Sequence, residues 1–114
     1  MEINRGDIYE IDWSPGRGSE QRGVRPSLII QNDIANSVSA YPVTIVLAIS
    51  SKIKNYPSTV TIEPTVENGL SVKSEINTGQ IMTIAKDRLG RRLGSISVTD
   101  LQKVTTKLTR MVCV

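Results

Sequence analysis

The stretch Val43-Thr44-Ile45-Val46-Leu47-Ala48-Ile49 is the most apolar run of the chain, and it decides the fold class. Ser50 and Ser51 end it. A continuous apolar run bounded by polar residues is typical of a strand that is buried on both faces. We therefore predict a buried strand over residues 43–49, around which the rest of the domain is built.

Shorter segments with strand character flank this run on both sides. Some alternate between apolar and polar residues, others hold an apolar core, and turn signals such as Asn68-Gly69 separate them. The further predicted strands cover residues 7–13, 25–31, 58–63, 70–76 and 80–84. Residues 32–42 are rich in Asn, Ser and Ala and are predicted to be a connection. Strands at such short spacing indicate a small barrel or sandwich.

The end of the chain changes to a helical period. Ser97-Val98-Thr99-Asp100 has the form of a capping box. Apolar residues then recur along one predicted helix face, at Leu101, Val104, Leu108, Met111 and Val112. Residues 111–114 are apolar, and we expect this end to pack on the barrel or on a second subunit.

Composition supports a mainly β domain and excludes several chemistries. Val, Ile and Thr make up 35 of 114 residues, and these β-branched side chains suit a pleated surface. The chain has no His and only one Cys, Cys113. It therefore cannot form a structural zinc site, a Cys-His pair or a Ser-His-Asp triad by itself. We expect one domain over residues 1–114, in a reducing cytoplasm and with no membrane segment.

The arginines fall into two groups. Arg17, Arg22 and Arg25 lie in or next to a polar, glycine-rich stretch over residues 16–23, which we expect to be a mobile surface loop. Pro26 favours an extended backbone at Arg25, at the mouth of a strand. Arg88, Arg91 and Arg92 precede the helix, and as a charge cluster they indicate a solvated surface. Arginine favours bidentate contact with phosphate, which makes the first group a candidate site.

Several blocks resemble a known family. Gly18-Ser19-Glu20-Gln21 and Gly23-Val24-Arg25-Pro26, together with residues 5–9, 30–33, 46–50 and 80–89, are similar to the MazF/PemK toxins, which are bacterial toxin–antitoxin endoribonucleases. The resemblance implies a homodimer of SH3-like barrels of the PemK/CcdB type, with short helical segments and a C-terminal helix. It also implies cleavage of single-stranded RNA without a metal or cofactor, and inhibition by a MazE-like antitoxin with an acidic C-terminal segment. The second arginine group could contact that antitoxin.

The same resemblance assigns roles to individual residues. It implies that Arg25 binds the scissile phosphate, that Ser50 donates a hydrogen bond to it, and that Glu20 accepts the proton of the RNA 2′-OH. Because RNA carries its own nucleophile, this chemistry requires neither His nor metal. The residues expected to contact RNA are Arg17, Ser19, Gln21, Arg22 and Gln80.

The sequence also allows other interpretations. Gly79 and Met82 stand where many relatives have an acidic residue and an arginine, which allows an altered sequence preference or an inactive relative that only binds nucleic acid or protein. A gyrase-poisoning toxin of the CcdB type has the same fold, but its C-terminal Trp-Gly-Ile is replaced here by Val112-Cys113-Val114. Without the family motif, Arg25 would be a strand-edge residue paired with Glu20 or Asp12. Trp13 is interpreted as a core or interface residue, with stacking on a base as the alternative if it is exposed near the loop.

Overall fold

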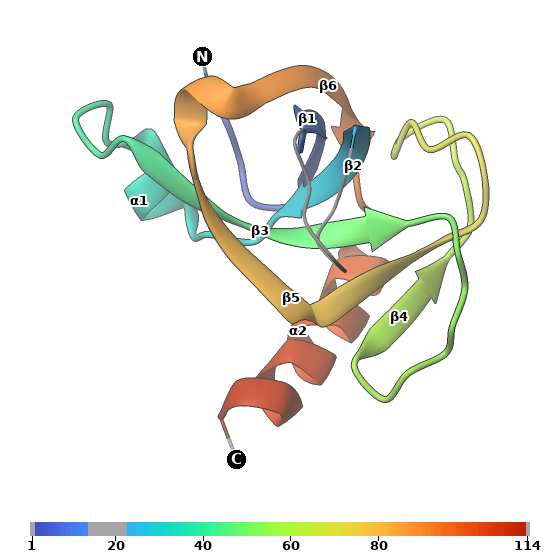
Figure 1. The fold of residues 1–114 in the computed structure, drawn as a ribbon. Coiled ribbons are helices and arrows are strands. Elements are labelled where there is room, and N and C mark those ends of the chain that lie inside the picture. Colours follow the sequence, from blue (N-terminus) through green and yellow to red (C-terminus); the bar gives the residue numbers. More distant parts are fainter. Residues whose placement is uncertain (1, 14–22, 114) are drawn as a thin grey trace.

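A six-stranded antiparallel sheet and one long helix make up most of the computed structural model, which describes residues 2–13 and 23–113 (Figure 1). In chain order the elements are β1 (Asp7–Asp12), β2 (Val24–Ile29), α1 (Asp33–Ser37), β3 (Val43–Ser50), β4 (Thr59–Ile62), β5 (Ser74–Ala85), the 3-10 helix η1 (Lys86–Arg88), β6 (Leu89–Ser95) and α2 (Val98–Val112).

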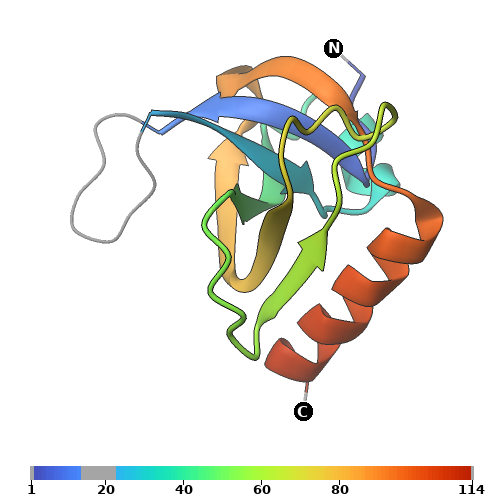
Figure 2. The same cartoon turned by 90° about the vertical axis from the view of Figure 1, so that its right-hand side faces the viewer.

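The strands are ordered β4-β5-β3-β2-β1-β6 in the sheet, and every neighbouring pair is antiparallel. The sheet curls strongly into an open barrel, and β4 and β6 are its two edge strands (Figure 1). Helix α2 packs along β4 and β5 (Figure 2). This agrees with the predicted mainly β barrel with a C-terminal helix.

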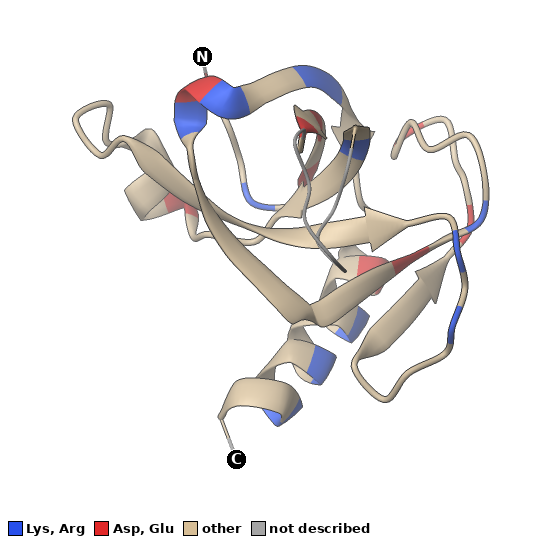
Figure 3. Cartoon of the chain, in the orientation of Figure 1, with Lys and Arg blue, Asp and Glu red and all other residues tan. Residues whose placement is uncertain are grey.

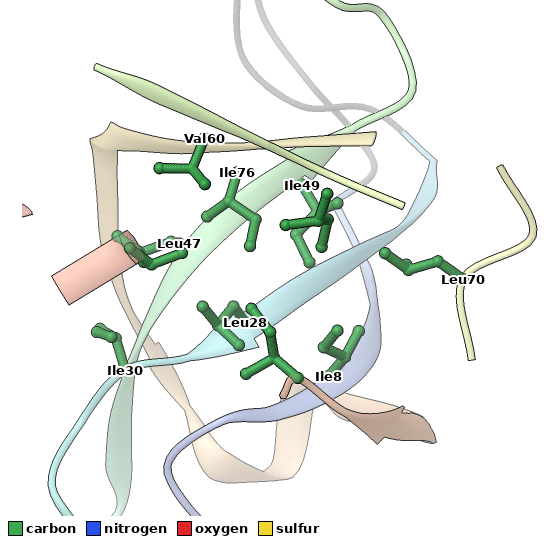
Figure 4. Close-up of a cluster of buried hydrophobic side chains, with 11 residues drawn as sticks. Ile8, Leu28, Ile30, Leu47, Ile49, Val60, Leu70 and Ile76 are labelled. Atoms are coloured by element: carbon green, nitrogen blue, oxygen red, sulfur yellow. The ribbon is translucent and has the colours of Figure 1, made fainter. Parts of the chain in front are cut away.

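Strand β3 is buried on both faces, as its apolar run predicts. Leu47 and Ile49 point into one core cluster, which also holds Ile8, Leu28 and Ile76 (Figure 4). Successive side chains of a strand point to opposite faces. The neighbouring Val46 therefore belongs to a second cluster on the other face of the sheet. The second cluster consists of Ile3, Tyr9, Ile11, Ile29, Val46, Ile84 and Leu89, with Trp13 and Met82 packed against it.

The two strands predicted over residues 70–76 and 80–84 correspond to one strand, β5, which begins only at Ser74, so the prediction of a strand over residues 70–73 was wrong. The pairing partner on β5 changes from Ile81 opposite Leu47 to Asn77 opposite Ala48, so residues 78–80 form a bulge. Thr78 is fully buried there, and its N–H and hydroxyl both donate to the Ser58 carbonyl, at 3.0 and 2.7 Å. This anchor keeps the strand continuous across polar residues that look like a break in the sequence.

Two further elements differ from the prediction. The connection over residues 32–42 contains α1, which begins after Asn32, whose side chain accepts the Ala35 N–H at 2.9 Å. Strand β6 was not predicted, and it places Arg91 and Arg92 on a strand that pairs with β1. The two arginines are exposed on that strand, which explains why the segment lacks an apolar signal.

The capping box before α2 is confirmed, since the Ser97 hydroxyl accepts the Asp100 N–H at 3.0 Å. Val104 is fully buried and packs on the first cluster. Met111 and Val112, however, remain 44% and 56% exposed. Packing of this end on the barrel was therefore a wrong prediction, whereas packing on a second subunit stays a prediction. Among the described residues, no helix is long and apolar enough to span a membrane.

Candidate functional site

Arg25 and Ser50 approach one another through the register of two neighbouring strands. Ser27 on β2 pairs with Ala48 on β3. Ser27 and Ala48 are the last paired residues at this end of the two strands, and Arg25 and Ser50 each lie two residues beyond that pair. Arg25 is exposed and Ser50 is half-buried. An exposed guanidinium and a strand-end hydroxyl thus lie at adjacent strand ends.

The Ser50 hydroxyl is oriented by a local turn. Its oxygen accepts the backbone N–H of Lys52 at 3.1 Å. A hydroxyl has one hydrogen to donate and two lone pairs. Because the contact with Lys52 uses a lone pair, the hydroxyl hydrogen remains able to donate to an anion. This is the role that the resemblance assigns to Ser50.

A buried carboxylate supports the same strand end, and sequence reasoning did not single it out. Glu75 lies opposite Ser50 on β5 and is only 4% exposed. Its Oε2 atom accepts the backbone N–H groups of Lys54 and Asn55, at 3.0 and 3.2 Å. The carboxylate therefore holds residues 52–55 in place after β3. The only signal in the sequence is an acidic residue within a predicted strand.

The ends of β1 and β2 are tied together beside Arg25. The backbone N–H of Trp13 donates to the Gly23 carbonyl at 2.8 Å, and Asp12 of β1 pairs with Val24 of β2. Arg88 donates to the Asp12 carbonyl at 2.6 Å, and its guanidinium lies 5.7 Å from the centre of the Trp13 ring. Trp13 packs against the second core cluster, which confirms its interpretation as a core residue.

The remaining residues of the predicted site have different outcomes. Arg17, Ser19, Glu20, Gln21 and Arg22 lie outside the described residues, as does the mobile loop predicted there. Gln80 is exposed in the bulge of β5, and β3 separates it from β2 and Arg25.

The two departures from the family pattern also lie on β5. The Gly79 N–H donates to the Asn77 side chain at 2.8 Å. Met82 is half-buried and packs against the second cluster. Met82 therefore takes part in core packing.

A cavity of about 280 Å³ adjoins Arg25. Its wall includes the start of β2, part of β6 and the connection between β4 and β5. Figure 3 shows the basic segments of β2 and β6 near one another on this side of the molecule. Sequence reasoning missed this cavity, because Arg91 of β6 and residues 69–74 are far from Arg25 along the chain.

The second arginine group is structural in part. Arg92 Nη2 lies 3.2 Å from Oδ1 of Asp7, whose side chain is only 5% exposed, and it donates to the Ser95 hydroxyl at 2.6 Å. Arg91 Nε lies 3.3 Å from Glu10 Oε1 at a more exposed position. The prediction of a merely solvated surface is therefore wrong for Arg92, which completes a network with a buried carboxylate.

These observations define a small, open β-barrel protein whose candidate site combines an exposed arginine with a strand-end hydroxyl, a combination suited to binding phosphate. Comparison with known families agrees. Residues 4–112 match the family described as "PemK-like, MazF-like toxin of type II toxin-antitoxin system", and the chain belongs to this family.

Individual relatives cover nearly the full chain. Endoribonuclease MazF9 of Mycobacterium tuberculosis is 34% identical over 110 residues, which is 93% of this chain and 92% of that protein. A mycobacterial endoribonuclease, solved in complex with its cognate antitoxin, is 25% identical with a TM-score of 0.77, over 95% of this chain and 92% of that one. MazF from Deinococcus radiodurans shares the fold at 21% identity, with a TM-score of 0.80 over 100% of this chain and 99% of that one.

Proposed function

We propose that this MazF-type endoribonuclease toxin cleaves single-stranded RNA without a metal ion, using the 2′-OH of the substrate as the nucleophile. The observation that carries the proposal is the pairing of Ser27 with Ala48, since Arg25 and Ser50 each follow two residues beyond it at neighbouring strand ends. Membership of the MazF-like family supplies the reaction class. Cleavage of messenger RNA in this way inhibits translation and growth.

The reaction needs charge stabilisation more than covalent chemistry from the protein. The 2′-oxygen attacks the adjacent phosphorus, the bond from phosphorus to the 5′-oxygen breaks, and the products are a 2′,3′-cyclic phosphate and a 5′-OH. Negative charge grows on the phosphoryl oxygens in the transition state. The Arg25 guanidinium presents paired N–H donors to these oxygens, and the Ser50 hydroxyl donates one further hydrogen bond.

Two protons must also move. One leaves the 2′-OH, and we assign its acceptor to Glu20 from the family motif, since a carboxylate that is partly desolvated becomes a more effective base. The other reaches the leaving 5′-oxygen, from a donor that we leave unassigned. Contacts of the RNA with Arg17, Ser19, Gln21, Arg22 and Gln80 belong to the same proposal and set the sequence preference.

The partners follow from the family and from the surface. A mycobacterial relative was solved with its cognate antitoxin, and we propose a MazE-like antitoxin for this chain, whose acidic segment competes with RNA for the basic site. The exposed Met111 and Val112 support a homodimer, because a second copy would remove their apolar surface from water. In this proposal residues 1–114 form one toxin domain, which works in the cytoplasm.

The proposal is tested by mapping RNA ends. Purified protein, free of antitoxin, is incubated with a defined single-stranded RNA in the presence of EDTA, and the ends of the fragments are sequenced and analysed by mass spectrometry. We expect cuts at a short motif, 2′,3′-cyclic phosphate ends, and loss of cutting when the nucleotide before the cut carries a 2′-deoxyribose. A folded protein that leaves a varied RNA pool intact would instead favour a binding module, the reading that Gly79 and Met82 left open.

A further inference from the structure

We infer that the cavity of about 280 Å³ beside Arg25 is a subsite for one nucleotide of the RNA, next to the phosphate that Arg25 binds. The inference rests on the proposed function and adds a binding site that the family motif does not contain. Most of its lining lies outside that motif, chiefly on β6 and in the connection between β4 and β5.

Part of the cavity wall is apolar and can receive a base. Pro26 and Ile49 contribute from β2 and β3, Leu70 and Val72 from the connection between β4 and β5, and Leu93 from β6. Small-molecule sites are mostly apolar with a few placed polar groups, and their volumes start at about 300 Å³. The volume therefore suits one small ligand group rather than a folded segment. A base in single-stranded RNA is unstacked and can enter such a cavity, whereas a base in a duplex cannot.

Polar groups line the same cavity at its rim. Arg91 is held through its Nε atom by Glu10, and its side chain is 74% exposed. The ion pair engages Nε, so the two Nη groups at the end of the side chain can donate to a phosphate. Arg25 and Arg91 line one cavity from different strands, and together they can bind two successive phosphates with the base between them. The hydroxyls of Ser51 and Ser71 add neutral hydrogen-bonding groups.

The wall formed by residues 68–72 is held in place before any ligand binds. Asn68 is buried, and its side chain accepts the N–H groups of Thr65 and Leu70, both at 3.0 Å. Gly69 has a φ of +69°, and a Cβ there would collide with the Leu93 carbonyl. The Ser95 N–H donates to the Glu67 carbonyl at 2.8 Å, which ties the connection to β6. A preformed cavity loses little entropy when a ligand binds.

The chemistry of the lining favours a nucleotide over an acidic peptide. Both would meet the arginines, but a base can occupy the cavity while the phosphates on either side of it stay at the rim. An extended acidic peptide would run along the basic rim and need not enter the cavity. A substitution that fills only the cavity interior should therefore weaken the binding of a nucleotide and leave the binding of an acidic peptide unchanged.

The test uses one variant that fills the cavity and one that removes a positive charge from its rim. It measures nucleic-acid binding independently of cleavage. The probe is a fluorescein-labelled single-stranded DNA decamer of randomised sequence, which cannot be cut because it lacks the 2′-OH. Fluorescence anisotropy at low salt gives the affinity of the intact protein, of Val72→Trp and of Arg91→Ala. Val66→Trp is the matched control on the same connection, at a residue 95% exposed and outside the cavity, and Arg110→Ala is the matched control for charge.

We expect Val72→Trp and Arg91→Ala each to weaken binding of the decamer about tenfold, and both controls to stay within about twofold of the intact protein. The same decamer annealed to its complement is expected to bind the intact protein and Val72→Trp equally. Far-ultraviolet circular dichroism confirms that each variant is folded, and Arg91→Ala tests the subsite even if Val72→Trp does not fold.

Several outcomes would overturn the inference. These are unchanged binding by Val72→Trp and Arg91→Ala, no binding of the decamer by the intact protein at low salt, or equal losses in the control variants. A cavity that serves only a protein partner would give the first of these results. RNA cleavage by the intact protein with unaltered binding by Val72→Trp would reject the subsite and keep the proposed function. Weakened decamer binding by Val72→Trp, with no RNA cleavage by the intact protein, would keep the subsite and reject the proposed function.

Discussion

Strand β1 has an exposed arginine on each side, and the two arginines have different surroundings. Arg25 on β2 pairs with Ile11, and Arg92 on β6 pairs with Tyr9. Arg92 is bound to the buried carboxylate of Asp7, whereas Arg25 is exposed and lines a cavity. A buried carboxylate fixes the arginine that it pairs with, while an exposed guanidinium at a cavity can be reached by a ligand. The same residue type therefore stabilises the fold in one place and is suited to binding phosphate in the other.

Replacement of Arg25 should give the largest effect. We expect Arg25→Ala to lower the RNA cleavage rate about 100- to 1,000-fold, since removing one donor from a charge-stabilising site has effects of this order. The free energy of unfolding should change by less than about 0.5 kcal/mol, because the residue is exposed. Single-turnover cleavage and urea unfolding measure the two quantities. Arg25→Lys keeps the charge but not the paired donors, and equal activity in Arg25→Lys and the unaltered protein would argue against bidentate binding.

Replacement of Ser50 tests the hydroxyl at the neighbouring strand end. Ser50→Ala should reduce the cleavage rate about tenfold, which corresponds to the loss of one hydrogen bond of roughly 1.4 kcal/mol in the transition state. Ser50→Thr is the matched control, because it retains the hydroxyl. Cleavage that is equally fast in Ser50→Ala and Ser50→Thr would show that the hydroxyl donates nothing to the reacting phosphate.

Replacement of Arg92 should affect stability and leave the chemistry intact. Arg92→Ala deprives the buried Asp7 of its cation, and we expect a loss of about 1 kcal/mol in the free energy of unfolding. The value is modest because the Arg92 side chain is 51% exposed and solvent screens the pair. Arg91→Ala is the matched control, with an expected loss below about 0.5 kcal/mol. A loss of cleavage in folded Arg92→Ala would contradict the division between the two arginines.

The smallest expected effect concerns Tyr9, which lies between the two arginine strands. Burial and the neighbouring Asp7 carboxylate raise the pKa of Tyr9 above its ordinary 10.0, while Arg92 lowers it. The folded protein therefore keeps the phenol proton at a pH where the unfolded chain loses it. Stability should be unaffected by this group below pH 10 and should fall as the pH rises from 10.0 through the raised pKa.

Urea unfolding across that pH range measures the effect. The fall should be smaller in Tyr9→Phe, whereas Tyr56→Phe, at an exposed position, serves as the control. Arg92→Ala should shift the titration of Tyr9 to still higher pH. Equal pH profiles for Tyr9→Phe and Tyr56→Phe would contradict the assigned burial effect.

The sequence predicted those elements that are determined by residues close together along the chain. The apolar run of β3 and the capping box of α2 are of this kind, because periodicity and a three-residue spacing are readable without tertiary contacts. Strand β5 was divided in two because Asn77, Thr78 and Gly79 look like a break, whereas in the fold this bulge is anchored by the hydrogen bonds from Thr78 to Ser58. Strand β6 was missed because the exposed Arg91 and Arg92 give it no apolar signal, and its pairing with β1 joins segments far apart along the chain.

The candidate site divides in the same way. Arg25 and Ser50 could be named from the family resemblance, because each lies in a short block that is recognisable in the sequence. The cavity with Arg91, and the support of the strand end by Glu75, could not be named, since each joins segments that meet only when the sheet curls.

The sequence by itself determined a core built largely from β-branched side chains, a capped terminal helix, and a residue inventory that lacks His and leaves arginine and hydroxyl groups for the chemistry. The tertiary structure decided which arginine pairs with a buried carboxylate and which lies exposed at a cavity. The physical reason is that side-chain periodicity is a local property of the chain. The register between distant strands, which sets the electrostatic surroundings of each charge, depends on how the whole core packs.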